Sequence, residues 1–385
     1  MNIYTNNEFQ TNDWIVCDYE TIFDNKKYNY FDVKNEFKYI TNFLKDRLGQ
    51  PRSICILGGF VVGATNWESI DLNDQYQALQ AGAGVFDASA MSYLHIKGPD
   101  ACNILNMLTP RSINQFAIGS ANFVIFTTTQ GTVDDESIVL KISDNEFLLS
   151  CGGCKLISHM HEAIRTFPNA IVKKSSLISF NIKGPKRFLA AELLLSTDPN
   201  TNISIRNTPT SSFKKVKFRN EKEGFIVKTK IGIEIWSDLS SILELWDFML
   251  NQRNIFTPCG WDVLNIYRME CKEIKFMLYP LDINARTSLH SIGCSWMISD
   301  KKYDYIGRSI LEKKLIKPSS KLYKLKCISQ TQVDSKIEYN TKINIYSDKN
   351  DFVGYITSGA FSPKYKTDIV YAYIFDKHIS STEFF

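Results

Sequence analysis

The chain has 385 residues, of which 44% are hydrophobic and 22% are charged, as is ordinary for a globular protein of two or three domains. Its net charge of +4 is small and no Lys/Arg-rich run appears, so we expect no nucleic-acid partner. No apolar run reaches the roughly 18 residues of a membrane span, and the polar residues 1–13 lack the apolar core of a signal peptide. We therefore expect a cytoplasmic protein with no membrane partner.

The nine cysteines are scattered along the chain, which is typical of reduced thiols in a cytosol. Only Cys151 and Cys154 form a CxxC pair. A zinc site would need a second such pair, and a redox site would need a helix that starts after the first cysteine. Two free thiols are the alternative, and the sequence leaves open whether either does any chemistry.

Residues 1–70 are predicted to form an N-terminal segment that packs on the core. Residues 31–48 have a helical pattern, and residues 53–62 are predicted to form one strand that a Gly-Gly pair interrupts. The sequence leaves open whether this segment belongs to the core or forms an added lid.

An internal repeat follows, because Ile-Lys-Gly-Pro occurs at residues 96–99 and again at residues 182–185. An apolar strand precedes each copy and a helical pattern follows it. After the first copy, apolar residues at i, i+3, i+4 and i+7 indicate one face of a helix. This face consists of Ala101, Ile104, Leu105 and Leu108.

Each copy then continues as three strands and a helix. The first has strands at 122–126, 137–142 and 146–150 and a helix at 156–165; the second has strands at 213–218, 224–228 and 231–236 and a helix at 241–252. We predict two similar α+β halves, residues 84–167 and 175–253, that pack face to face with a cleft between them. Chance repetition in a chain rich in Lys and Ile is the alternative, and the matching order of elements argues against it.

The two halves are expected to make up a core domain of residues 71–258. A helical connecting segment, residues 259–318, follows it and begins with a helix at 260–271. Residues 319–385 are predicted to be a small β-barrel or sandwich. Its strands are expected at 325–329, 341–347, 352–358 and 369–374.

A tight connection at Gly131–Asp135 places two carboxylates, Asp134 and Asp135, where a strand begins. A carboxylate that loses water needs a partner or a task, so this strand start is a candidate site.

Seven short motifs in the same order resemble the aminomethyltransferase superfamily, whose best-known member is the glycine-cleavage T-protein. They cover about residues 84–374. The matches are Gly84–Met91 to GLFDVSHM, Gly98–Ala101 to GPDA, Gly131–Asp135 to GGIIDD, Ile231–Ile235 to GFEI, Asp262–Glu270 to ARDTLRLE, Tyr305–Arg308 to DFIGRE, and Val353–Gly359 with Ser362–Pro363 to VGxVTSG…SP.

The resemblance implies an α+β fold of three domains, arranged as a cloverleaf around a central pocket for tetrahydrofolate or its 5-methyl or 5,10-methylene form. It also implies that Asp134 is the catalytic aspartate; a turn aspartate that bonds its own backbone is the alternative. Glu136 departs from the apolar residue usual in the family. Strand alternation puts it on the side of Asp134, so we name it as a second catalytic candidate, with a solvated strand residue as the alternative.

Glu234 resembles the family's pterin anchor, because a carboxylate can accept two N–H donors from a 2-amino-4-oxo pyrimidine edge. Alternation places Trp236 beside it as a pocket wall; an exposed strand face is the alternative. Arg268, on an apolar helix face, resembles a folate-site arginine, and an internal salt bridge to Glu270 or Asp262 is the alternative. Met91 matches a family methionine near folate, with a core methionine as the alternative.

Other departures fall on the substrate side. Phe123 stands where the family commonly has the tyrosine of AxYT, so we place it at the pocket without a hydroxyl. Ala90 replaces a histidine, and Ser150–Cys154 replaces VNAAN. These changes favour the branch of tetrahydrofolate-dependent demethylases and methyltransferases.

We therefore expect a folate-dependent one-carbon (methyl) transferase that acts on a small-molecule substrate, as an O-, S- or N-demethylase or as a biosynthetic methyltransferase. The alternatives are an aminomethyltransferase that works with a lipoyl carrier protein, a folate-binding protein without turnover, and an enzyme that uses the pocket without folate. No cluster of His or Cys residues suggests a metal.

Overall fold

The computed structural model describes residues 14–18, 40–57, 60–152, 155–197, 203–271, 282–283, 286–299, 304–312, 318–328 and 343–378. The chain divides into two compact units. One comprises residues 70–260 and 285–321, and the other residues 1–69, 261–284 and 322–385. No helix among the described residues is long and apolar enough to cross a membrane.

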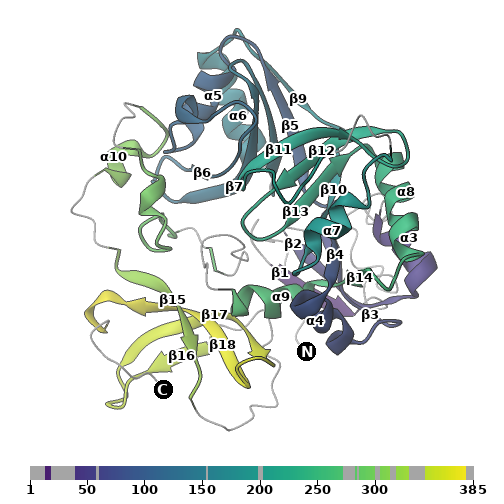
Figure 1. Ribbon diagram of the computed structural model, residues 1–385. Helices are drawn as coiled ribbons and strands as arrows, with labels where there is room; N and C mark the ends of the chain where they lie inside the picture. The colour runs from purple at the N-terminus through teal and green to yellow at the C-terminus, as the bar shows by residue number, and fades with distance from the viewer. Residues whose placement is uncertain are drawn as a thin grey trace, which may run out of the picture. The chain divides into compact units, whose positions relative to one another are not determined.

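The first unit contains a five-stranded sheet in the order β6-β7-β8-β5-β9 (Figure 1). Its strands are β5 (Ser92–Lys97), β6 (Ala121–Thr127), β7 (Val133–Ser143), β8 (Glu146–Cys151) and β9 (Ile171–Lys174). Helices α5 (Ala101–Leu108) and α6 (Lys155–Thr166) contact each other and this sheet, and the short helix η1 (Ile113–Gln115) follows α5. The helix face predicted from the spacing of Ala101, Ile104, Leu105 and Leu108 is confirmed, because all four are buried in one cluster with the sheet.

The same unit contains a six-stranded sheet in the order β11-β12-β13-β10-β4-β14. Its strands are β4 (Ala83–Asp87), β10 (Ile178–Lys183), β11 (Ser212–Lys217), β12 (Glu223–Lys228), β13 (Ile233–Ser237) and β14 (Phe256–Cys259). Helices α7 (Arg187–Glu192) and α8 (Leu239–Leu250) contact β10 and β13, while α4 (Leu72–Ala81) contacts β4 and β14.

The two sheets share one connectivity. In each, a strand and a helix are followed by three antiparallel strands, and the last of these pairs antiparallel with the first strand. The order β6-β7-β8-β5 therefore corresponds to β11-β12-β13-β10. The two sheets differ beyond this common part. In the first, β9 pairs with β5; in the second, β4 pairs with β10 on one side and with β14 on the other.

The glycines of the repeated Ile-Lys-Gly-Pro motif serve the same structural need. Gly98 and Gly184 have φ values of 135° and 99°, which disfavour any other residue. A Cβ at Gly98 would lie 2.5 Å from the oxygen of Asn169, and one at Gly184 would lie 2.6 Å from the oxygen of Gly82. The chain passes another backbone too closely at both points to allow a side chain.

The two sheets pack face to face through one apolar cluster. Tyr93 and Leu148 come to it from the first sheet, and Val227 and Trp236 from the second. The expected packing of the two halves is thus confirmed, while their predicted bounds, 84–167 and 175–253, stay a prediction.

The other unit contains a three-stranded sheet, β1-β2-β3, beside α3 (Ile40–Leu48). The strands are β1 (Trp14–Asp18), β2 (Pro51–Leu57) and β3 (Phe60–Trp67), and β2 pairs antiparallel with β3. The single strand predicted at 53–62 was therefore wrong, because the chain reverses between β2 and β3. Of the helix predicted at 31–48, residues 31–39 lie outside the described part.

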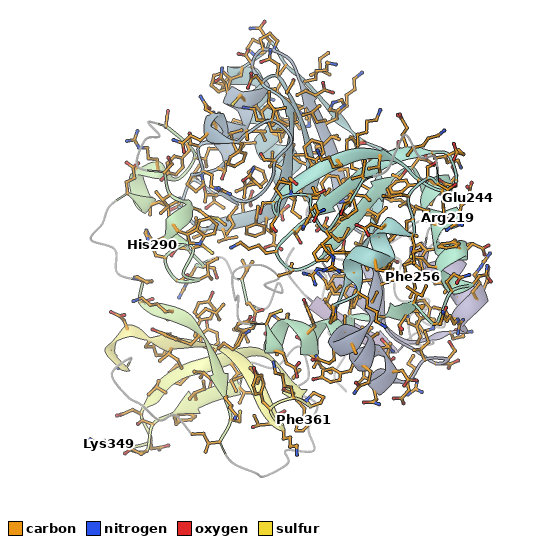
Figure 2. All side chains as sticks on the ribbon, in the orientation of Figure 1. Arg219, Glu244, Phe256, His290, Lys349 and Phe361 are labelled. Atoms are coloured by element: carbon orange, nitrogen blue, oxygen red, sulfur yellow. The ribbon has the colours of Figure 1, made fainter. Side chains whose placement is uncertain are left out.

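A four-stranded sheet of this unit has the order β15-β18-β17-β16. It consists of β15 (Ser320–Lys326), β16 (Ile343–Tyr346), β17 (Phe352–Ser362) and β18 (Thr367–Phe375), followed by η4 (Asp376–His378). Helix α9 (Trp261–Glu270) contacts β17 and β18. Phe361 on β17 is 52% exposed, whereas Phe256 on β14 is buried; Figure 2 labels both side chains. The cloverleaf, the C-terminal barrel and the domain bounds 1–70, 71–258, 259–318 and 319–385 stay predictions.

Candidate functional site

Glu234 and Trp236 lie on the face of β13 that is turned toward the first sheet. Trp236 is fully buried, and its Nε1 donates a 2.9 Å hydrogen bond to Oε2 of Glu234. Burial raises the pKa of Glu234, while the bond from Trp236 and the charge of Lys183 oppose that shift. The exposed strand face that was the alternative for these residues is excluded, because Trp236 has no exposed surface and Glu234 is half-buried.

Tyr93 on β5 faces this pair from the other sheet. Its ring meets that of Trp236 edge to face at 4.9 Å between centroids, and its hydroxyl donates a 2.5 Å hydrogen bond to Oγ of Ser179. Burial and the charge of Glu234 raise the pKa of Tyr93, so its hydroxyl stays protonated. Tyr93 was not among the predicted site residues, although it lies two residues after Met91.

Two further predicted residues border the same cluster. Met91 is half-buried and packs against it. Phe123 on β6 pairs with Ile138 on β7, and Ile138 also packs against the cluster. The structure thus brings Met91, Phe123, Glu234 and Trp236 to the facing sides of the two sheets.

Glu136 lies two residues before Ile138 on β7, so strand alternation places it on that same inner side. It is half-buried, and burial followed by the charge of Asp135 raises its pKa to about 8. The neighbouring charge that acts on Glu136 is thus that of Asp135. Glu136 is therefore not the solvated strand residue that was its alternative interpretation.

Asp134 lies at the start of β7, where a register shift lets Val133 pair with Thr127 and Asp135 with Phe126. This bulge interrupts the alternation, so the face of Asp134 does not follow from that of Glu136. Asp134 is half-buried, and its Oδ2 atom is buried. A strand starts here as predicted.

The turn before Asp134 is held by a segment that follows it much later in the chain. The N–H of Val133 donates a 2.7 Å hydrogen bond to the oxygen of Thr287. A Cβ at Gly307, just before the short helix α10 (Arg308–Leu311), would lie 2.9 Å from the Cα of Gly131. The short helix η3 (Ser295–Met297) lies between Thr287 and Gly307 in the sequence. His290, just before it, forms hydrogen bonds through its side chain with Ser295 and with the backbone oxygen of Leu311.

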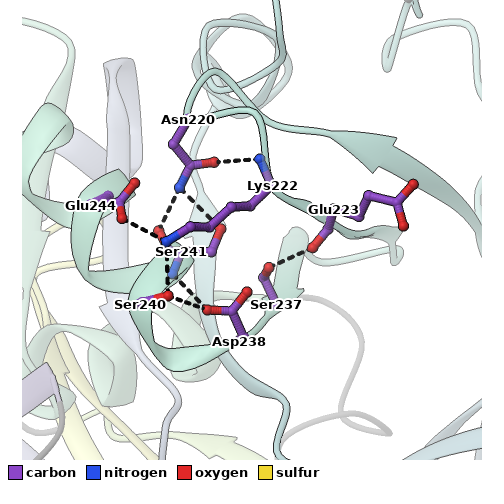
Figure 3. Close-up of polar contacts among 8 residues, drawn as sticks. All are labelled: Asn220, Lys222, Glu223, Ser237, Asp238, Ser240, Ser241 and Glu244. Atoms are coloured by element: carbon purple, nitrogen blue, oxygen red, sulfur yellow. Dashed lines mark hydrogen bonds and ion pairs between the residues drawn. The ribbon is translucent and has the colours of Figure 1, made fainter.

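The end of β13 is fixed by a capping network at the start of α8 (Figure 3). Oδ1 of Asp238 accepts hydrogen bonds from the backbone of Ser241 at 2.9 Å and from Oγ of Ser240 at 2.6 Å. Lys222, on the turn before β12, donates from Nζ to the carboxylate of Glu244 at 2.6 Å. The hydroxyl of Ser237 donates to the backbone oxygen of Glu223 at 2.7 Å. These contacts hold the strand that carries Glu234 and Trp236.

Arg268 lies on α9 in the other compact unit. Its guanidinium is buried, with Nη1 2.7 Å from Oδ2 of Asp282, which is fully buried. Nε bonds Asn265 at 2.7 Å, and Asp282 also accepts bonds from Thr357 and Ser358 at 2.5 and 2.6 Å. An internal salt bridge is therefore present, with Asp282 as the partner and not Glu270 or Asp262. The folate role of Arg268 stays a prediction.

Cys151 is buried at the end of β8, and its Sγ donates to the oxygen of Ser92 at 3.4 Å. Burial and then the charge of Asp135 raise its pKa, which disfavours a reactive thiolate. Cys154 lies outside the described residues.

Comparisons with known proteins agree with this fold. The chain superimposes on the crystal structure of glycine cleavage system aminomethyltransferase T from Bartonella henselae with a TM-score of 0.73 at 17% identity, covering 86% of this chain and 88% of that one. The fold is that of an aminomethyltransferase. A family model described as the GCVT N-terminal domain matches residues 36–302, and the chain therefore belongs to this family, within the aminomethyltransferase superfamily.

Curated relatives are similar over most of their length. The aminomethyltransferase of Prochlorococcus marinus (strain NATL2A) is 25% identical over 340 residues, which is 83% of this chain and 87% of that protein. The aminomethyltransferase of Bacteroides fragilis (strain YCH46) is 25% identical over 318 residues, which is 78% of this chain and 82% of that protein.

Proposed function

We propose that this protein is a tetrahydrofolate-dependent one-carbon transferase that acts on a small molecule. The observation that carries the proposal is the carboxyl group of Glu234, oriented by Trp236 on an interior sheet face. Trp236 and the charge of Lys183 stabilise this carboxylate only in part, because burial still raises its pKa, and a ligand with N–H donors would stabilise it further. Membership of the GCVT N-terminal domain family supports the proposal.

The residues present fit the pterin ring of tetrahydrofolate. Glu234 can accept two N–H donors from the 2-amino-4-oxo pyrimidine edge. Trp236 and Tyr93 offer aromatic surface beside it, and Met91 offers a polarisable thioether. When bound, tetrahydrofolate would supply the nitrogen that gives or takes the one-carbon unit.

This chain's own residues would position the reactants and handle protons. The raised pKa of Glu136, about 8, keeps its carboxyl protonated at neutral pH, so that it can donate a proton to a leaving group. Asp134 would orient the substrate through its carboxylate.

Glu136 is also the reason for preferring a small-molecule methyl substrate. A protonated carboxyl suits a neutral leaving oxygen or sulfur that must gain a proton as its methyl group departs. We therefore place O-, S- or N-methyl compounds first, in either direction of transfer.

Aminomethyl transfer from a lipoyl carrier protein is the second candidate. The names of the relatives from Prochlorococcus marinus and Bacteroides fragilis favour it. In that reaction Asp134 would orient the aminomethyl group. The raised pKa of Glu136 would then need an explanation other than proton donation to a leaving group.

Calorimetry with tetrahydrofolate tests the proposal, with wild type beside Glu234→Ala. We expect micromolar binding that the substitution weakens by about tenfold or more, since hydrogen bonds to a charged group contribute roughly 1.5–3 kcal/mol. Glu223→Ala removes an exposed carboxylate at the start of β12, the strand next to β13, and as the matched control it should bind normally. No binding to wild type would contradict the proposal and favour an enzyme that works without folate.

The reaction is then identified by turnover with methoxy, methylthio and N-methyl compounds, beside an aminomethylated lipoyl carrier. Methyl transfer to tetrahydrofolate supports the first candidate, and ammonia release from the carrier supports the second. Folate binding with no turnover of either class would leave a folate-binding protein without transferase activity.

A further inference from the structure

One face of β10 is polar although it points into the protein. Ile178, Phe180 and Ile182 alternate with three polar residues, Ser179, Asn181 and Lys183. The apolar residues are buried on the side of the helices, as is usual for a strand covered by α7 and α8. The polar residues share the other side with Trp236 and Glu234, because Ser179 pairs with Trp236 and Asn181 with Glu234.

Little of this polar row faces solvent. Ser179 and Lys183 are only 1% and 4% exposed, and Asn181 is half-buried. Ser179 has its partner within the protein, the hydroxyl of Tyr93. Lys183 acts on Glu234 through its charge.

Asn181 differs from both neighbours. Its Oδ1 atom is buried and has no hydrogen-bond partner among the described residues. A buried polar atom without a hydrogen bond is costly, so this position is a candidate contact for a ligand that completes it.

The neighbouring strand leaves room for the side chain of Lys183. A Cβ at Gly232, just before β13, would lie 3.4 Å from Nζ and 3.2 Å from Cγ of Lys183. The lysine thus lies over a residue without a side chain, beside Glu234. An ammonium donor, an amide and a carboxylate therefore meet on adjoining positions of two paired strands.

We propose that Asn181 and Lys183 complete, with Glu234, a binding site for the amide edge of a 2-amino-4-oxo pyrimidine ring. Glu234 accepts from the ring N–H and from one hydrogen of the 2-amino group. The side-chain oxygen of Asn181 accepts the other hydrogen of that amino group, and the Lys183 ammonium donates to the 4-oxo oxygen. Each polar group of the edge then has a partner of the opposite kind. This inference rests on the proposed use of tetrahydrofolate and adds two specificity-determining residues to it.

Asn181→Leu tests the amide, because leucine has a similar volume and no polar atom. We measure binding of tetrahydrofolate, and of its analogue without the 2-amino group, by calorimetry, and unfolding in urea without ligand. We expect tetrahydrofolate to bind the variant about tenfold or more weakly, while the analogue binds wild type and variant alike. Unfolding without ligand should need at least as much urea as for wild type, because an uncompensated polar atom has been removed.

Lys183→Met tests the ammonium in the same assays, and it should weaken binding of both ligands, since both carry the 4-oxo group. Ser179→Ala is the matched control on the same strand: it should lower the urea midpoint through the lost bond to Tyr93 and leave discrimination between the two ligands intact.

The outcomes separate this inference from the proposed function. If wild type does not bind tetrahydrofolate, both fail. If wild type binds and Glu234→Ala does not, but Asn181→Leu and Lys183→Met bind as wild type does, this inference alone is overturned. A loss of stability in Asn181→Leu with equal weakening of both ligands would show a structural role and would also overturn it.

Discussion

Trp236 and Glu234 are neighbours on one face of β13, and the indole N–H of Trp236 donates the hydrogen bond that orients the carboxyl group of Glu234. An indole N–H beside a half-buried carboxyl group favours its charged form, because the donor stabilises negative charge. The carboxylate is the form that can accept N–H donors. The pair therefore sets the direction of the proposed pterin anchor, and the bond from Trp236 opposes the rise in the pKa of Glu234 that burial causes.

Trp236→Phe removes this donor and keeps an aromatic ring beside Tyr93. We expect the pKa of Glu234 to rise further, so that tetrahydrofolate binding weakens and its loss on acidification begins at a higher pH than in wild type. Calorimetry across pH 5–8 measures this. Trp246→Phe is the matched control, because Trp246 is 1% exposed and its Nε1 has no hydrogen-bond partner among the described residues. Equal effects of the two substitutions would contradict the role of the bond.

Glu136 is expected to make stability fall as pH rises. Its pKa is raised from 4.5 to about 8 in the folded protein, so the folded state keeps a proton that the unfolded state releases between these values. The free energy of unfolding should decrease through that window, by at most about 1.4 kcal/mol per pH unit, and level off above it. Glu136→Gln should flatten the curve and be more stable than wild type at pH 8. Urea unfolding at several pH values tests this, and an unchanged curve for Glu136→Gln would show that another group is responsible.

The buried pair of Arg268 and Asp282 is expected to be a stabilising element of its unit. Arg268→Met leaves Asp282 charged and buried, so we expect a loss of about 3–5 kcal/mol in the free energy of unfolding. The double variant with Asp282→Asn should lose less than the sum of the single changes. Urea unfolding of all four proteins measures this coupling. Normal stability of Arg268→Met together with lost tetrahydrofolate binding would instead support the predicted folate role.

The two glycines of the repeated motif allow a matched comparison of strain and space. Gly98→Ala and Gly184→Ala add a Cβ in a region of positive φ and against a backbone oxygen. Gly119→Ala adds one at a φ of 84° with nothing within 4 Å, so it should cost only about 1 kcal/mol. We expect the first two to cost clearly more, as measured by thermal unfolding. Equal costs at all three positions would mean that the neighbouring backbone moves away easily.

Strands and helices of the repeated halves could be predicted because their signals are local. Alternation and Gly-Pro punctuation mark β5 and β10, and the 3.6-residue period marks α5. Glu234 and Trp236 could be placed on one face for the same reason. The same alternation places Asn181 and Lys183 together on the other face of β10. Only the apolar residues of that strand were used for the prediction, so these two polar residues were not named as site residues.

Other features could not be predicted, because they depend on contacts between distant segments. Asp282 pairs with Arg268 only after the chain has folded back, and nothing near residue 282 marks it as the partner. The strand predicted at 53–62 was wrong because a continuous apolar run has the same appearance whether or not the chain reverses within it. The bulge at Asp134 likewise arises from its pairing with β6.

The place of β4 has a consequence for how the chain reaches its native state. This strand is made before the first sheet, yet it pairs with β10 and with β14, so that the partner of Phe86 on one side is Cys259. Pairing over such a separation closes a long loop and slows folding. During synthesis, the first sheet can form while β4 still waits for both neighbours. The six-stranded sheet is then completed only after residue 259 has left the ribosome, and until that point β4 has an unpaired edge of the kind that favours aggregation.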